Sequence, residues 1–345
     1  MANNKNHVLA GDVGGTKTVL ALFNGDTGYR KPLKKQRFSS SAYSSLAEIV
    51  KEFLSDEDSV IRNAIFGVAG PVRNGHSHIT NLPWVIDARE LEDQLRAPVY
   101  LMNDLAATAY AIPFLESSDM LTLNPGKSSA HENIGIVAPG TGFGEAFLVW
   151  SGDHYQALAS EGGHVGFAPR NSLQMELLEY LQERYGHVSF ERVCSGSGLP
   201  NIYNFLKDRG GYTEPDWLKA ALKDAKDPTP VIVKAAMDEQ VDICMATLDI
   251  FVDILGNEAG NLALKILATG GIYLAGGMPT RILPWLQKPG FMNSFSSKGR
   301  FTEMLGDIPV QVVLNPESPL MGAACFGLET HGVISKNIRE RRNDG

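Results

Sequence analysis

The stretch "LAGDVGGTKT" (residues 9–18) decides the fold, because it is close to a phosphate-binding P-loop without being one. A P-loop reads G-x-x-x-x-G-K-[ST] and leads from a strand into a helix whose N-terminus helps to hold the phosphate. Here Thr16 stands where the second glycine belongs. The residues after Lys17, "TVLALF", are typical of a strand, and the turn "NGDTG" follows them. The stretch therefore predicts a β-hairpin.

The turn of this hairpin offers another way to hold phosphate. Glycines let the backbone N–H groups of a tight turn approach an anion closely, and the Thr16 hydroxyl adds a donor. Asp12 would repel a bare phosphate, but its carboxylate suits a Mg²⁺ ion lying between the two. A plain structural turn is the alternative interpretation.

A second hairpin, "PGTGFGE" (residues 139–145), has a similar turn. The longer stretch around it (134–150) follows the plan of the opening, strand, Gly/Thr turn and strand, which indicates an internal repeat. Two phosphate-binding turns that hold one nucleotide are therefore one hypothesis, and two ordinary turns are the other.

The length of 345 residues exceeds what a single core usually serves, so two lobes are expected. Predicted strands at 64–72 and 99–104 alternate with predicted helices at 46–54 and 105–112, which is typical of an α/β protein. Further elements are predicted as helices at 172–186, 239–268 and 320–330, and as strands at 271–278 and 309–315.

Composition excludes several function classes. A net charge of −8 and a pI near 5.5 argue against nucleic-acid or anionic-membrane binding, which needs a basic face. No apolar run reaches the ~20 residues of a membrane span, and the polar N-terminus lacks the apolar core of a signal peptide. Cys194, Cys244 and Cys325 are too far apart for a zinc or redox motif. We therefore expect a cytoplasmic protein without structural zinc.

Six short motifs occur in the order seen in bacterial glucokinases, and the chain resembles this family from about residue 8 to residue 328. The motifs are "GDVGGT" (11–16), "MND" (102–104), "GTGFG" (140–144), "EGGHVGFAP" (161–169), "ERVCSGSGL" (191–199) and "AGGM" (275–278).

The resemblance implies a two-lobed actin-like ATPase (ribonuclease H-like) α/β fold. A smaller domain (1–113 plus 316–345) and a larger one (114–315) would enclose a ligand cleft. It also implies phosphorylation of D-glucose by ATP to glucose 6-phosphate, the entry step of glycolysis, with Mg²⁺.

One residue departs from the family pattern, because Lys17 stands where many members have Asn. The sequence "GGTK" is commoner in the related ROK sugar kinases and repressors. Those proteins carry a cysteine-rich zinc motif after a Glu-Gly-His segment, and residues 161–181 contain no cysteine. No helix-turn-helix extension precedes Asp12 either, so the glucokinase family is preferred and Lys17 is a local variation.

Phosphoryl transfer to a sugar needs positioning, charge neutralisation and a base for the attacking hydroxyl. Asp104 follows a predicted strand and starts a helix, where its carboxylate is placed to accept a proton or merely to cap the helix. The matched motif favours the base. Asn103 both donates and accepts, which suits a sugar hydroxyl.

Glu161 and His164 flank two glycines, an arrangement that would let both side chains converge on one polyol. The alternatives are a metal site, for which further ligands at suitable spacing are missing, and a surface loop. Glu191 is a third acidic sugar contact by the resemblance, and an exposed acid at a helix start by local sequence. Asn81 is a weaker candidate.

The resemblance carries these assignments over residue by residue. The glucose contacts are Asn103, Asp104, Glu161, His164 and Glu191. The ATP-binding residues are Gly11, Asp12, Val13, Gly14, Gly15, Thr16, Gly140, Thr141, Gly142, Gly276 and Gly277. Gly276 and Gly277 are on the adenosine side unless they form only a strand-ending turn. Asp12 orients Mg²⁺ through a water molecule.

Three alternatives remain beside a glucokinase. The first is a kinase for another hexose or an amino sugar, and the second is a non-catalytic sugar-sensing regulator of the same fold. The third, a chaperone-like ATPase, would need a peptide-binding module for which the length leaves no room. A homodimer is a further expectation.

Overall fold

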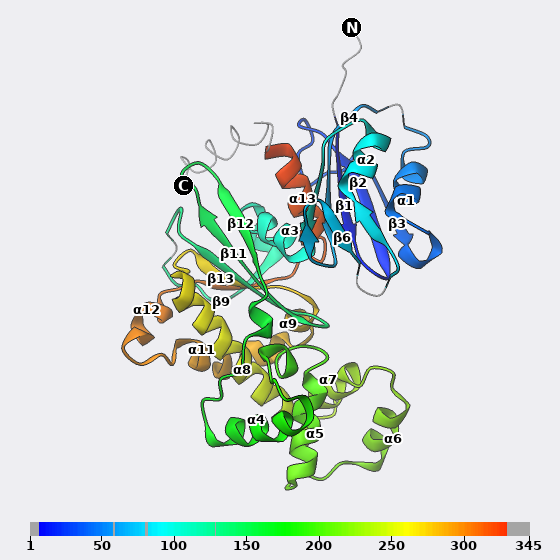
Figure 1. Ribbon diagram of the computed structural model, residues 1–345. Helices are drawn as coiled ribbons and strands as arrows, with labels where there is room; N and C mark the ends of the chain where they lie inside the picture. Colours follow the sequence, from blue (N-terminus) through cyan, green and yellow to red (C-terminus); the bar gives the residue numbers. More distant parts are fainter. Residues whose placement is uncertain (1–6, 58, 80–81, 128, 330–345) are drawn as a thin grey trace. The chain divides into compact units, whose positions relative to one another are not determined.

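The computed structural model describes residues 7–57, 59–79, 82–127 and 129–329. The chain forms two compact units, each with its own sheet. Unit 1 combines the residues up to Glu116 with those from Asn315 onward, and unit 2 spans Ser117–Leu314 (Figure 1). The chain therefore passes from one unit to the other twice.

The main sheet of unit 1 has the strand order β3-β2-β1-β4-β8. Strands β1, β4 and β8 run parallel, whereas β2 and β3 are antiparallel to their neighbours. A small antiparallel sheet, β5-β6-β7, completes the unit. The strands are β1 (His7–Val13), β2 (Lys17–Phe23), β3 (Lys34–Ser39), β4 (Ile61–Val68), β5 (Val72–Arg73), β6 (His76–His78), β7 (Val85–Asp87) and β8 (Val99–Asn103).

The predicted opening hairpin is confirmed. Strands β1 and β2 pair in antiparallel register, and the Gly14 N–H donates to the Lys17 carbonyl oxygen at 2.9 Å to close the turn. Gly11 lies within β1, where a Cβ atom would come within 2.5 Å of the Phe66 ring. Packing against β4 therefore requires a glycine at this position, independently of any ligand.

In the described residues of unit 1, the α-helices beside the sheet are α1 (Leu46–Phe53), α2 (Ala88–Leu95), α3 (Asp104–Ala111) and α13 (Ser318–Glu329). Helix α13 comes from the end of the chain and packs on α3 and β1 (Figure 1). A Cβ atom on Gly322 would lie 1.7 Å from the Ala107 carbonyl oxygen, so the two helix backbones touch. The end of the chain thus completes the core of unit 1.

The sheet of unit 2 has the order β12-β11-β10-β13-β14-β9. Its first five strands repeat the unit 1 pattern, with three antiparallel strands followed by two parallel ones. The predicted internal repeat is therefore confirmed at the level of topology. The strands are β9 (Met120–Asn124), β10 (Ile134–Pro139), β11 (Phe143–Trp150), β12 (Tyr155–Ser160), β13 (Gly271–Leu274) and β14 (Val310–Val313).

A long buried helix, α8 (Asp242–Ile266), forms the centre of the unit 2 core. It confirms the helix predicted over 239–268, although the observed helix is shorter than the predicted one at both ends. The other helices are α4 (Ser172–Tyr185), α5 (Leu199–Arg209), α6 (Asp216–Asp224), α7 (Thr229–Met237), α9 (Gly277–Arg281), α10 (Leu283–Leu286), α11 (Pro289–Ser296) and α12 (Thr302–Gly306). Short 3-10 turns are η1 (Ser40–Ala42), η2 (Ile112–Phe114), η3 (Ser117–Asp119), η4 (Gly162–His164), η5 (Phe190–Arg192) and η6 (Gly299–Phe301).

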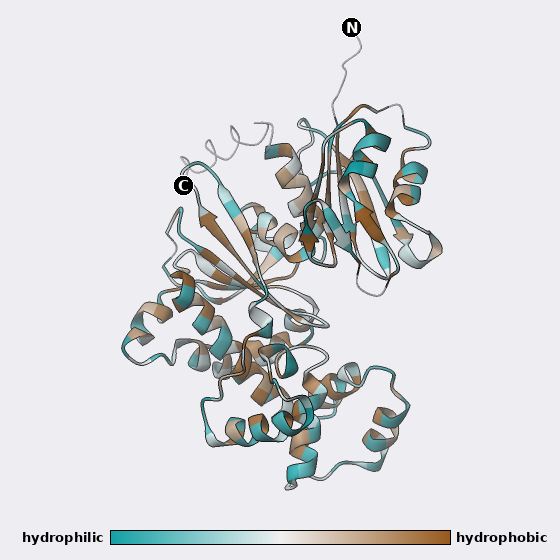
Figure 2. Cartoon of the chain, viewed as in Figure 1, coloured by the Kyte–Doolittle hydropathy of each residue, from teal (hydrophilic) through white to brown (hydrophobic). Residues whose placement is uncertain are grey.

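The hydropathy of the residues follows this arrangement of sheets and helices. Hydrophobic residues gather on the strands of both main sheets, whereas α2 is largely hydrophilic (Figure 2). None of the helices in the described parts of the chain combines the length and apolarity needed to cross a membrane.

The contact between α13 and α3 gives a direct test of the packing of unit 1. Gly322→Ala should lower the free energy of unfolding by about 1 to 3 kcal/mol, because the new methyl group meets the Ala107 backbone. Gly290→Ala is the matched control, since this helical glycine has open space around its Cα. Chemical denaturation of both variants measures the difference, and equal stabilities would contradict the close approach.

Candidate functional site

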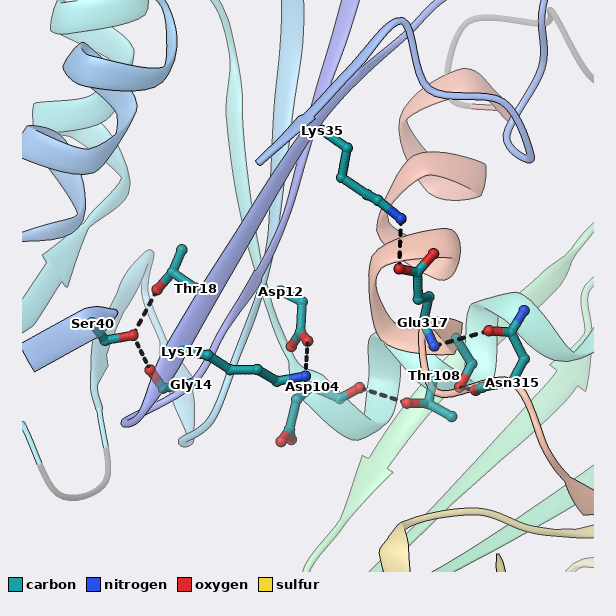
Figure 3. Close-up of polar contacts among 11 residues, drawn as sticks. Asp12, Gly14, Lys17, Thr18, Lys35, Ser40, Asp104, Thr108, Asn315 and Glu317 are labelled. Carbon is teal, nitrogen blue, oxygen red and sulfur yellow. Dashed lines mark hydrogen bonds and ion pairs between the residues drawn. The ribbon is translucent and has the colours of Figure 1, made fainter. Parts of the chain in front are cut away.

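Parallel pairing brings the first group of predicted residues to one edge of the unit 1 sheet. Asp12 pairs with Gly67 on β4, and Val68 pairs with Asn103 on β8. The carboxyl ends of β1, β4 and β8 therefore meet, which is where open α/β sheets commonly bind ligands. Asp12 and Asp104 both lie at this edge (Figure 3).

Ser40 fixes the glycine-rich turn from outside the motif. Its hydroxyl donates to the Gly14 carbonyl oxygen at 2.7 Å and lies 3.0 Å from the hydroxyl of buried Thr18 (Figure 3). Its backbone N–H donates to the Thr16 carbonyl oxygen at 3.1 Å. These hydrogen bonds tie the turn to η1. Sequence reasoning missed Ser40, which no local pattern links to the turn.

Asp12 lies beside Lys17, with 3.9 Å between the carboxylate Oδ2 and the ammonium Nζ. Burial raises the pKa of Asp12 above its ordinary value, and the positive charge of Lys17 opposes that rise. Lys17 therefore supports the charged form of the acid at the turn.

Asn103 and Asp104 lie where β8 gives way to α3. The Asn103 side chain is the N-cap and accepts from the Leu105 N–H at 2.9 Å, while its amide donates to the Gly70 carbonyl oxygen at 3.3 Å. Asp104 Oδ1 also accepts from the Leu105 N–H, at 2.8 Å. The two side chains thus share the Leu105 N–H, and Asn103 can cap the helix when Asp104 takes another role.

Burial raises the pKa of Asp104 to about 6, and the negative charge of Asp12 adds to the rise. The Leu105 N–H, which donates to the carboxylate, opposes it. A carboxyl group with this pKa is largely ionised at neutral pH and still holds a proton well enough to act as a base.

The second group of predicted residues lies in unit 2, at the carboxyl ends of the parallel strands β10 and β13. The turn after β10 is closed by the Gly140 N–H, which donates to the Gly142 carbonyl oxygen at 2.8 Å. Gly276 adopts φ +83°, and a Cβ atom there would lie 2.7 Å from the Pro139 carbonyl oxygen. The two predicted nucleotide turns, Gly140–Gly142 and Gly276–Gly277, are thus adjacent.

Glu191 connects the 140–142 turn to the 3-10 turn η5. Its Oε2 accepts from the Phe143 N–H at 3.0 Å, and a Cβ atom on Gly142 would lie 2.6 Å from that oxygen. The Gly196 N–H also donates to the Gly140 carbonyl oxygen, at 2.7 Å. The partly buried Glu191 side chain therefore stabilises the turn, in addition to being a predicted sugar contact.

Glu161 and His164 have exposed side chains at the start and end of η4. Residues three apart in a 3-10 turn lie on the same side, so both face one direction. The glycines between them are buried, because a Cβ atom on Gly163 would lie 1.9 Å from the Phe143 carbonyl oxygen. These glycines serve close packing against β11.

The predicted residues thus form two sets. Unit 1 gathers the turn at 11–16 with Asn103 and Asp104, and unit 2 gathers Glu161, His164, Glu191 and both nucleotide turns. Asn81 lies outside the described residues.

Comparison with solved structures defines the class of protein. A glucokinase from an Antarctic psychrotroph superposes with a TM-score of 0.80 at 33% sequence identity, over 93% of this chain and 98% of that one. The ROK family glucokinase from Streptomyces griseus, solved with glucose and AMPPNP, has a TM-score of 0.60 at 16% identity, over 93% and 99% of the two chains, and shares the fold. The fold is that of a two-lobed, actin-like sugar kinase.

Sequence comparison narrows the class to one family. The family model described as glucokinase matches residues 9–330. The glucokinase of Nostoc punctiforme is 41% identical over 332 residues, which are 92% of this chain and 97% of that protein. The chain therefore belongs to the glucokinase family and is a hexose kinase.

The neighbouring charges make the titration of Asp104 testable. In the metal-free protein its carboxyl group should titrate near pH 6, and Asp12→Asn should lower that pKa because a negative charge is removed. NMR of protein with ¹³C-labelled aspartate carboxyl groups follows the signal, which is assigned by its loss in Asp104→Asn. A pKa that stays the same in Asp12→Asn would contradict the interaction between the two acids.

Proposed function

We propose that this chain transfers the γ-phosphoryl group of ATP to D-glucose, with Asp104 as the general base. The observation that carries the proposal is the partly buried Asp104 carboxyl, whose pKa is raised to about 6 at the carboxyl end of the parallel strand β8. A base works best when its pKa lies near the working pH. The relative from Streptomyces griseus binds glucose together with an ATP analogue, which supports this pair of substrates.

The proposed reaction uses Asp104 once per turnover. Its carboxylate takes the proton of the glucose 6-hydroxyl as that oxygen bonds to the γ-phosphorus. The bond from the γ-phosphorus to the oxygen that bridges to the β-phosphate breaks, and ADP leaves with its electron pair. The carboxylic acid then returns its proton to water, and glucose 6-phosphate is released.

Substrate binding would be divided between short, rigid segments. Asn103, Glu161, His164 and Glu191 would hold the glucose hydroxyls, because each offers a donor or an acceptor to a polyol. The turns at 11–16 and 140–142 would present backbone N–H groups to the phosphates. Their rigidity supports the proposal, since donors that are already fixed need no rearrangement when charge develops.

Magnesium fits the residues at the edge of unit 1, where the carboxylate of Asp12 is the available ligand. In the described part of the chain no group of three or more His, Cys, Asp or Glu side chains is arranged to hold a metal ion alone. Mg²⁺ usually takes only one or two carboxylates and completes its shell with phosphates and waters. When bound, it would neutralise charge on the phosphates, with Asp12 orienting it through water.

The proposed compartment is the cytoplasm. All three cysteines are buried free thiols, as is usual in a reducing environment.

Asp104→Asn should lower kcat by roughly 10² to 10⁴-fold while glucose still binds, because an amide cannot accept the hydroxyl proton. The amide oxygen can still accept from the Leu105 N–H, so the start of α3 should stay intact. A coupled ADP assay measures turnover, and calorimetry measures glucose binding. Near-normal kcat would remove Asp104 as the base.

The matched control is Asp87→Asn, an aspartate that caps the start of α2 by accepting from the Arg89 N–H at 2.8 Å. It should keep wild-type kcat, because it makes the same kind of helix contact away from the proposed site. A panel of hexoses and amino sugars in the same assay tests specificity. Turnover of another sugar without turnover of glucose would contradict glucose as the substrate.

A further inference from the structure

The segment that carries Glu161 and His164 rests on a buried acid. Glu145 on β11 pairs in register with Ser160, the residue just before Glu161. Its side chain is 2% exposed, and a Cβ atom on Gly162 would lie 2.0 Å from its Oε2. The Glu145 carboxyl group therefore lies directly against the backbone of segment 160–164.

A second acid, Glu258 on α8, lies beside Glu145 and is completely buried. Its Oε1 accepts from the Lys265 ammonium group at 2.9 Å, and its Oε2 accepts from the Asn261 amide at 2.7 Å. Glu145 is within hydrogen-bonding reach of Glu258. We call Glu145 and Glu258 the buried acid pair.

The buried acid pair has one close cation for two carboxyl groups. Lys265 is bonded to Glu258, while Oε1 of Glu145 is buried without a hydrogen-bond partner among the described residues. Lys298 donates to Asn257 and Asn261, and its charge interacts with that of Glu258. The nearby Cys194 thiol is neutral, because burial raises its pKa well above the ordinary value. Among the described residues, the charges that act on Glu145 are those of Glu258 and Lys265.

Glu145 is therefore expected to exchange its proton near neutral pH. Burial raises its pKa to about 7, and the negative charge of Glu258 adds to the rise, while Lys265 opposes it. A protonated carboxyl group can donate to the Glu258 carboxylate, which is a strong charge-assisted hydrogen bond. Two ionised carboxylates would instead repel each other in a buried setting.

We propose that Glu145 is a positioning residue for sugar binding, and that its proton holds segment 160–164 in the conformation that presents Glu161 and His164. The inference rests on the proposed placement of the sugar at this segment. When Glu145 loses its proton, repulsion from Glu258 drives its carboxylate toward Gly162, where no free space exists. The segment shifts and sugar binding weakens, whereas Asp104 belongs to the other unit and keeps its chemistry.

The test is the pH dependence of the glucose KM at saturating Mg·ATP, measured with the full-length protein. In the wild type, KM should rise about tenfold between about pH 6 and about pH 8, with a much smaller change in kcat. Glu145→Gln should keep the low-pH KM across the range, because its amide stays neutral and still donates to Glu258. Any effect of His164 is present in both proteins and cancels.

If the glucose KM of Glu145→Gln rises with pH as much as that of the wild type, Glu145 does not have the proposed role. Glu161→Gln separates this from the proposed sugar site, since it should raise KM about tenfold at every pH without changing the pH dependence. An unchanged KM in Glu161→Gln would contradict the sugar site itself.

A second measurement does not depend on the folding of any variant. If glucose binds the protonated form better, wild-type protein should take up a fraction of a proton on binding glucose above about pH 7. Calorimetric titration with glucose in phosphate and in Tris buffer detects this uptake as a buffer-dependent heat. Equal heats after correction for buffer dilution would overturn the proposal.

Discussion

Two carboxyl groups at the carboxyl ends of parallel strands are the constraint on which the site depends. The register of β1, β4 and β8 brings Asp12 and Asp104 to the same edge of the sheet, at the ends of two strands that β4 separates. Burial and the negative charge of Asp12 raise the pKa of Asp104. Burial also raises the pKa of Asp12, and the positive charge of Lys17 opposes that rise. The fold thus produces one acid suited to proton transfer and one suited to a cation.

The same strand plan serves both units, but it is used differently in each. In unit 1 this edge carries two acids, Asp12 near the end of β1 and Asp104 just after β8. In unit 2 the corresponding edge carries backbone turns, Gly140–Gly142 and Gly276–Gly277. In both units, residues distant in sequence hold the turn by hydrogen bonds. These residues are Ser40 in unit 1, and Glu191 and Gly196 in unit 2. Tertiary hydrogen bonds therefore hold the backbone of each turn in place, while the short glycine motifs determine the shape of the turn.

The sequence predicted the features that depend on neighbouring residues. The β-forming residues after Lys17 excluded a P-loop helix. The junction at Asn103 and Asp104 could be predicted because a strand pattern is followed there by a helix pattern. The pattern could not reveal Ser40 or the burial of Glu145, since their partners lie far away in sequence. It also assigned the glycines at 162 and 163 to convergence of Glu161 and His164, whereas the structure uses them for packing against β11. Helices α5 to α7 were not predicted.

The central claim, that Asp104 receives the proton of the attacking sugar hydroxyl, is tested most directly by a crystal structure with glucose and a nonhydrolysable ATP analogue. The account predicts the glucose 6-hydroxyl within hydrogen-bonding distance of the Asp104 carboxylate, with the γ-phosphate in line on its other side. Glucose bound with its 6-hydroxyl away from Asp104, or facing a different acid, would contradict it.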